Sequence, residues 1–322
     1  MAQFVQGSFR YKELPVVDFK PSDCSSMAGT TQQDTLFAEQ LRCFLQMDRT
    51  TRPLSQDYIN LQSTTLSDED RDREVAWLAD FCEQNHLADN RWHMAFARAV
   101  DIIDRYISSA FVHETSLHLL TMVAFFISYK VDDDQGHEIL TSSLLPLLPN
   151  CTGKEILHGE LEILDRLEWN VDRPTPQHFV LMALFQANLG EQVLAEVYDA
   201  ANRFIMIALS SSSLAWAQSS VIGTAALMCA LTYLFKLKRS FTARCPLSYD
   251  QWVEVIYNTL GSVMNHAEMV QVDDLARFIM IDYYASKGVN VKEEEEKQTP
   301  NDSGDVVERE RDAPPTPQAP AQ

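Results

Sequence analysis

Residues 116–130 read SLHLLTMVAFFISYK and contain one of the two most apolar stretches of the chain, Leu117–Tyr129. In a helix, its apolar side chains would point in nearly every direction, which predicts a helix buried on all sides. The other stretch, Val221–Phe235, predicts a second buried helix. Both are shorter than the roughly 20 residues that a membrane span needs, which favours the core of a soluble protein.

Amphipathic segments surround the first buried stretch. Apolar residues at helical spacing predict helices that begin near Asp34 and Ser67 and others that cover Trp92–Ser108 and Lys154–Trp169. In the last of these, the expected apolar stripe consists of Leu157, Leu161, Leu164 and Leu167. No period-two alternation of useful length occurs, so the sequence predicts no β-sheet.

A proline-containing break divides the pattern into two halves. Pro174 and Pro176 exclude a continuous helix through this region. Five further helical segments follow, at Gln177–Ala187, Leu194–Leu209, Ser219–Lys236, Ser248–Val263 and Asp273–Tyr284. The chain therefore predicts an all-α protein of two groups of about five helices, each built around one buried helix.

Composition sets the expected domain limits. Residues 1–34 predict a flexible N-terminal segment, residues 35–172 an N-terminal helix and first bundle, and residues 173–287 a second bundle. Residues 288–322 hold nine acids, four bases, five prolines and no aromatic residue. Such a segment buries too little apolar surface to offset its loss of conformational entropy, so we expect a disordered acidic tail.

The overall charge and the cysteines narrow the class of protein. A formal net charge of −20 disfavours general binding to nucleic acid or to anionic membrane, both of which need clustered lysine and arginine. The six cysteines form no Cys-x-x-Cys pair, and we find no signal-peptide pattern. We therefore expect reduced thiols in an intracellular protein.

No catalytic or metal-binding motif is present in the sequence. His113 and His118 are five residues apart, whereas the zinc-protease motif needs two histidines four residues apart on one helical face. The chain also lacks a Gly-x-Ser-x-Gly element and a kinase-type glycine loop. We expect no enzyme activity, no cofactor and no metal.

Several motifs in fixed order resemble the cyclin family. They are RDREVAWLADFCEQ at 71–84, AVDIIDRYIS at 99–108, SLHLLTMVAFFISYK at 116–130 and EILHGELEILDRLEWNVDRPTPQHF at 155–179. The resemblance covers residues 35–180 well and residues 180–285 more loosely. It implies tandem cyclin folds and a regulatory subunit that binds and activates a cyclin-dependent serine/threonine kinase as a heterodimer, in cell-cycle entry.

The resemblance also implies roles for individual residues. Arg71 and Asp104 match a structural ion pair between helices. The positions that match the kinase interface are Lys130, Val131, Glu160, Trp169, Phe37 and Leu41. From residue types alone, Phe37 and Leu41 fit equally well as residues buried against the first bundle.

Within the family, the chain is most similar to the D-type cyclins, through DFCEQ, EWNV, TPQHF and the acidic run before Thr299. This similarity implies a nuclear and cytoplasmic protein, with a retinoblastoma-type substrate reached through the kinase. Thr299-Pro300 and Thr316-Pro317 match the pattern of proline-directed phosphorylation sites. No Leu-x-Cys-x-Glu element occurs. Trp77 remains from the family's substrate-docking patch, where Arg73 and Glu74 replace aliphatic residues.

Two alternatives remain at this stage. The chain could be a cyclin-fold scaffold, or a transcription-associated cyclin without a cell-cycle role. A basic surface would favour binding to nucleic acid, whereas this chain is acidic.

Overall fold

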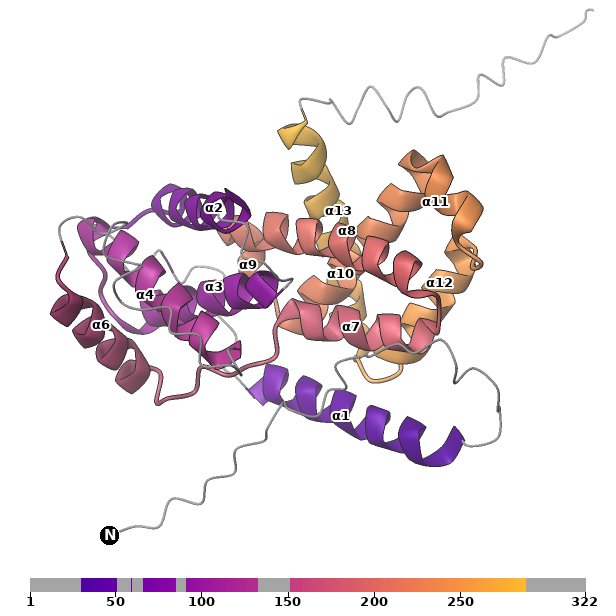
Figure 1. Ribbon diagram of the computed structural model, residues 1–322, viewed down its shortest axis with the longest axis horizontal. Helices are drawn as coiled ribbons and strands as arrows, with labels where there is room; N and C mark the ends of the chain where they lie inside the picture. Colours follow the sequence, from indigo (N-terminus) through magenta and orange to yellow (C-terminus); the bar gives the residue numbers. More distant parts are fainter. Residues whose placement is uncertain (1–29, 51–58, 60–65, 85–90, 133–150, 288–322) are drawn as a thin grey trace, which may run out of the picture. The chain divides into compact units, whose positions relative to one another are not determined.

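The structure is a computed structural model that describes residues 30–50, 59, 66–84, 91–132 and 151–287 (Figure 1). In these ranges every regular element is helical, as the sequence predicts. The elements are α1 (Thr30–Thr50), α2 (Asp68–Gln84), α3 (Arg91–Ser109), α4 (Glu114–Asp132), α6 (Gly153–Arg166), α7 (Pro176–Ala187), α8 (Glu191–Ser210), α9 (Ser212–Ala215), α10 (Ser219–Leu237), α11 (Arg239–Arg244), α12 (Tyr249–Ile256), the π-helical turn η4 (Tyr257–Gly261) and α13 (His266–Ser286).

Helix α4 is the centre of the first bundle, as its all-round apolar sequence predicts. Every residue from Leu120 to Ser128 is buried. Helices α2, α3 and α6 pack on α4. Ser128 lies in this core because its hydroxyl donates to the carbonyl oxygen of Ala124, one turn earlier.

Helix α10 has the same central position in the second bundle. Every residue from Ser220 to Leu227 is buried, and α7, α8 and α12 pack around this helix (Figure 1). By length and composition α10 could cross a membrane, but 67% of that apolar window is buried inside the protein. Its apolar surface is therefore used mainly within the second bundle.

Two glycines show how closely the helices approach. A Cβ at Gly223 of α10 would lie 2.4 Å from the carbonyl oxygen of Pro176, whereas one at Gly159 of α6 would lie 3.6 Å from the Cγ2 of Val123. We expect Gly223→Ala to lower the free energy of unfolding by about 1–3 kcal/mol, because backbone must move. Gly159→Ala should raise it by up to about 1 kcal/mol, because alanine favours the helix. Chemical denaturation of the two variants checks this, and equal effects would contradict the packing.

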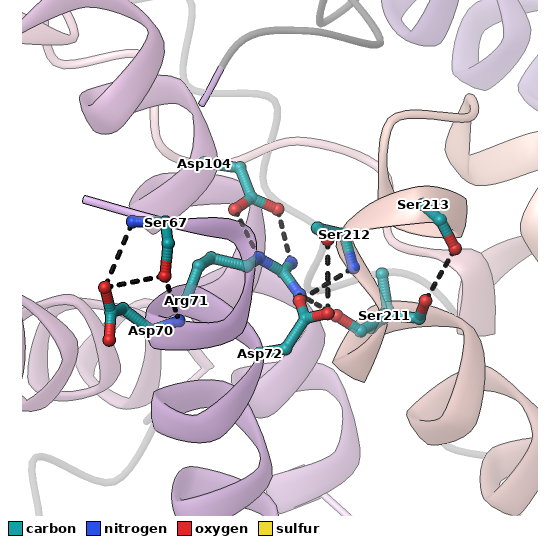
Figure 2. A network of polar contacts seen from close by, with 9 residues as sticks. Ser67, Asp70, Arg71, Asp72, Asp104, Ser211, Ser212 and Ser213 are labelled. Atoms are coloured by element: carbon teal, nitrogen blue, oxygen red, sulfur yellow. Dashed lines mark hydrogen bonds and ion pairs between the residues drawn. The ribbon is translucent and has the colours of Figure 1, made fainter. Parts of the chain in front are cut away.

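A buried arginine joins the two bundles. The Arg71 guanidinium of α2 donates from Nε and Nη2 to the Asp104 carboxylate of α3, at 3.0 and 2.7 Å (Figure 2). Its Nη1 donates to the carbonyl oxygen of Leu209, near the end of α8, at 2.7 Å. Beside it, the Asp72 carboxylate accepts from the backbone N–H and the hydroxyl of Ser212. Adjacent residues of α2 therefore contact both α3 and the second bundle.

Helix α1 is anchored to the second bundle at its C-terminal end. The buried Asp48 carboxylate accepts the backbone N–H groups of Ser219 and Ser220, which are unpaired donors at the start of α10. Arg49 donates two bonds to the Glu268 carboxylate of α13, at 2.7 and 2.6 Å. A third bond runs from Arg49 to the carbonyl oxygen of Val263. These polar contacts fix the register of α1 on the bundle.

The described residues up to Tyr283 form one compact unit that contains both bundles. The expected boundaries at 34, 172 and 287 stay predictions. The proposed flexible segments, 1–34 and 288–322, lie largely or wholly outside the described residues.

Candidate functional site

The candidate site is built on α6, whose first turn is fixed by its own side chains. The Thr152 hydroxyl accepts the backbone N–H of Glu155, and the Glu155 carboxylate accepts the backbone N–H of Thr152 in return. These bonds satisfy donors that a helix start leaves open. The bond from the Thr152 backbone lowers the pKa of the Glu155 carboxyl. The capping box sets where α6 begins and hence which residues face outward.

Lys130 and Glu160 form an ion pair that links the end of α4 to the middle of α6. The Lys130 ammonium also lies 4.1 Å from the ring centroid of Phe126, one turn earlier on α4. This position over the ring face adds a cation–π attraction. Lysine is exposed here while the glutamate is mostly covered, so the ammonium keeps donors available at the surface.

Exposed apolar side chains surround this pair. Leu157, Glu160 and Leu161 share one face of α6 because they are three and four residues apart. Both leucines are exposed, as is Val131 next to Lys130. We call Val131, Leu157, Leu161 and Trp169, together with the Lys130–Glu160 pair, the α4–α6 patch. Large apolar groups gathered around a charged pair are typical of a surface that binds another protein.

Trp169 is held outward by an unusual helix end. Glu168 and Trp169 both have left-handed backbone, with φ of 53° and 60°. This conformation costs a non-glycine residue about 1–2 kcal/mol. The Trp169 backbone N–H donates to Leu164, and its indole N–H donates to the Asp165 carboxylate at 3.1 Å. The outcome is a tryptophan that is 62% exposed just beyond the end of α6.

The other residues expected at a kinase interface do not join this patch. Phe37 is half-buried, and its ring stacks on Phe185 of α7 with centroids 5.6 Å apart. Leu41 is 2% exposed, so it fills the core and offers no surface to a partner. Both residues lie on α1, which contacts α7 and α10 of the second bundle, whereas the alternative expected burial against the first bundle.

Trp77, the remnant of a docking patch, lies among charged groups. Its ring stacks on Phe81 at 5.5 Å and meets the His118 ring edge-on at 4.4 Å. The Nδ1 of His118 contacts the Glu74 carboxylate at 2.5 Å. Arg73 lies nearby, 3.8 Å from Glu114. Arg73 and Glu74, which replace aliphatic residues, thus pair with other polar side chains near a partly covered tryptophan.

Two further expectations concern residues that the structure does not describe. Thr299 and Thr316 both lie in the range 288–322.

Within the described ranges, no group of three or more histidine, cysteine or acidic residues could hold a metal ion.

Sequence reasoning missed the two exposed leucines. The expected apolar stripe joined Leu157 and Leu161 to Leu164 and Leu167. The structure buries Leu164 and Leu167 together with Ile156 and Ile163, and it exposes Leu157 and Leu161. The available signal was the width of the apolar sector: α6 has more apolar residues than one face of a helix can bury.

Comparison with known proteins agrees with this architecture. Residues 40–172 match the family model described as Cyclin, N-terminal domain. Over this range the chain is similar to the cyclin family. It is 23% identical to G1/S-specific cyclin-D2 of Rattus norvegicus over 237 residues, which cover 72% of this chain and 79% of that protein. It is 24% identical to G1/S-specific cyclin-D1 of Bos taurus, over 52% of this chain and 55% of that one.

A solved structure supports the fold of both bundles. The X-ray structure of a viral cyclin from herpesvirus saimiri aligns with a TM-score of 0.56 and 19% sequence identity. The alignment covers 74% of this chain and 97% of that one. The chain is thus all-α with tandem cyclin folds, and the relatives named above are D-type cyclins.

Proposed function

We propose that this chain is a cyclin, the regulatory subunit of a cyclin-dependent kinase, which it binds through the α4–α6 patch. The observation that carries the proposal is the exposed row of Leu157, Leu161 and Trp169 beside the Lys130–Glu160 pair. A rigid helical frame holds this row, so little side-chain entropy is lost when a partner covers it. The cyclin itself makes and breaks no bond.

The pair of opposite charges suits contact with a partner's backbone. Lys130 has donors for carbonyl oxygens at the end of a helix, and Glu160 has acceptors for backbone N–H groups. If the kinase exposes those groups only in its active arrangement, binding shifts its population toward that arrangement. The difference in the cyclin's affinity for the active and inactive kinase then sets how far the kinase equilibrium shifts toward the active state.

The proposal is tested by binding the full chain to a panel of purified cyclin-dependent kinases. We expect at least one kinase to bind, and Leu161→Asp to weaken its binding by about tenfold or more, since a charge would enter an apolar contact. Tyr257→Asp, at an exposed aromatic residue of η4, is the matched control and should bind like the parent. Absence of binding to every kinase, or equal losses in both variants, would overturn the proposal.

We further propose a role in cell-cycle entry, in the nucleus and the cytoplasm, with a retinoblastoma-type substrate reached through the kinase. The similarity to G1/S-specific cyclins supports this finer assignment. The paired charges around Trp77 favour substrates that reach the kinase without an apolar docking contact on this face. Phosphorylation of Thr299 and Thr316 is proposed on the Thr-Pro motifs alone.

A further inference from the structure

Helix α13 has apolar residues on two opposite faces. One face lies in the second bundle, where Val272, Leu275 and Ile279 are buried. On the other face Val270, Phe278 and Ile281 are exposed. With about 3.6 residues per turn, these three occupy a sector about 80° wide, opposite the buried residues. A helix needs only one such face to pack on its own bundle, so the second face is available to a partner.

The exposed face carries a charge pattern that complements itself. Val270, Asp274, Arg277 and Ile281 follow one another in steps of four, three and four residues, which is the spacing of a coiled-coil seam. The seam therefore has an apolar residue at each end and two opposite charges in the middle. Asp274 and Arg277 are well exposed and lie 3.8 Å apart within the helix. In the opposite chain direction the seam again begins and ends with an apolar residue, but the acidic and the basic residue exchange places.

We propose that α13 binds α13 of a second copy of this chain, antiparallel across a two-fold axis. In that arrangement Val270 lies opposite the partner's Ile281, and Asp274 lies opposite the partner's Arg277. The charge pair and the apolar pair each form twice, as a two-fold interface requires. Phe278 lies beside the seam and covers part of the apolar contact.

The charge order argues for a second copy as the occupant. A two-fold axis places opposite charges together only when acid and base lie at equal distances from it, as Asp274 and Arg277 do. A seam of about 16 Å is short, so the dimer is weak and forms at high concentration. The α4–α6 patch is on the other bundle, so the proposed dimer leaves it uncovered and does not depend on the proposed kinase binding.

The test is sedimentation equilibrium of the full chain and of two charge-reversed variants. The parent should dimerise reversibly, and added salt should weaken the dimer. Asp274→Arg places two bases in the seam centre, and Arg277→Asp places two acids there. Like charges would then face each other across the axis, so each variant alone should dimerise at least about tenfold less well. Mixed in equal amounts, the two variants should form a heterodimer, because each base then meets an acid. Heterodimer formation also shows that both variants are folded.

Two results would overturn the proposal. One is a parent that stays monomeric at all concentrations up to its solubility limit. The other is a dimer that both variants retain unchanged, since its interface would lie elsewhere. Phe278→Ala gives an independent check: it should weaken the parent dimer and the mixed heterodimer alike, by removing the same apolar contact.

Discussion

Replacing Arg71 by alanine is expected to lower the free energy of unfolding by about 3–5 kcal/mol, the usual cost of leaving a buried charge without its partner. The Arg71 side chain has no solvent exposure, and Asp104 is nearly as buried. Without the guanidinium, the Asp104 carboxylate loses two bonds and the Leu209 carbonyl loses one. Thermal and denaturant unfolding of the variant measure the loss.

The same helix supplies a matched control. Arg73 is mostly exposed and pairs only with surface acids, so Arg73→Ala should change stability by less than about 1 kcal/mol. Replacing both members of the buried pair, as Arg71→Met with Asp104→Leu, should cost less than Arg71→Ala alone. A loss in Arg71→Ala no larger than that in Arg73→Ala would contradict the network as described.

Replacing Lys130 by alanine should cost about 2–5 kcal/mol of kinase binding, which is about thirtyfold or more in affinity. The loss should be large because Glu160 and the kinase's carbonyl groups would be left without a donor in a desolvated contact. Glu160→Ala should have a similar effect. Because the two residues act as one pair, the double variant should lose less than the sum of the two single losses.

Two controls belong to this second experiment: one shows that the variants are folded, and the other shows that the effect depends on the position of the lysine. Neither side chain fills the core, so the melting temperatures of all three variants should stay close to that of the parent. Lys154→Ala removes another exposed lysine, at the start of α6, and should leave affinity unchanged. Unchanged affinity in a folded Lys130→Ala or Glu160→Ala variant would remove that residue from the binding surface.

The central helices were predictable because their sequence signal is local. Nearly continuous apolar residues in α4 and α10 leave only one physically reasonable position, the middle of a bundle. The meeting of Lys130 with Glu160, and of Arg71 with Asp104, followed from the family resemblance and not from spacing. No local pattern brings together residues 30 or more positions apart.

The remaining features depend on packing between distant segments. Arg71 reaches the carbonyl of Leu209, and Asp48 reaches the start of α10, across more than 130 residues. Helical periodicity shows that α6 has an apolar stripe but cannot show which of two stripes the bundle buries. Leu157 and Leu161 were therefore placed in one apolar stripe with Leu164 and Leu167, although the structure exposes the first two and buries the others.

The most direct test of the central claim is the rate of phosphate transfer from ATP to a protein substrate by a purified cyclin-dependent kinase, with and without this chain. We expect the parent chain to raise this rate strongly with at least one kinase. The double variant Lys130→Ala/Glu160→Ala should not raise the rate at the same concentration. A kinase that binds the chain through the α4–α6 patch yet shows no rate increase would contradict activation and indicate a scaffold. An equal rate increase by the double variant would contradict the assigned surface.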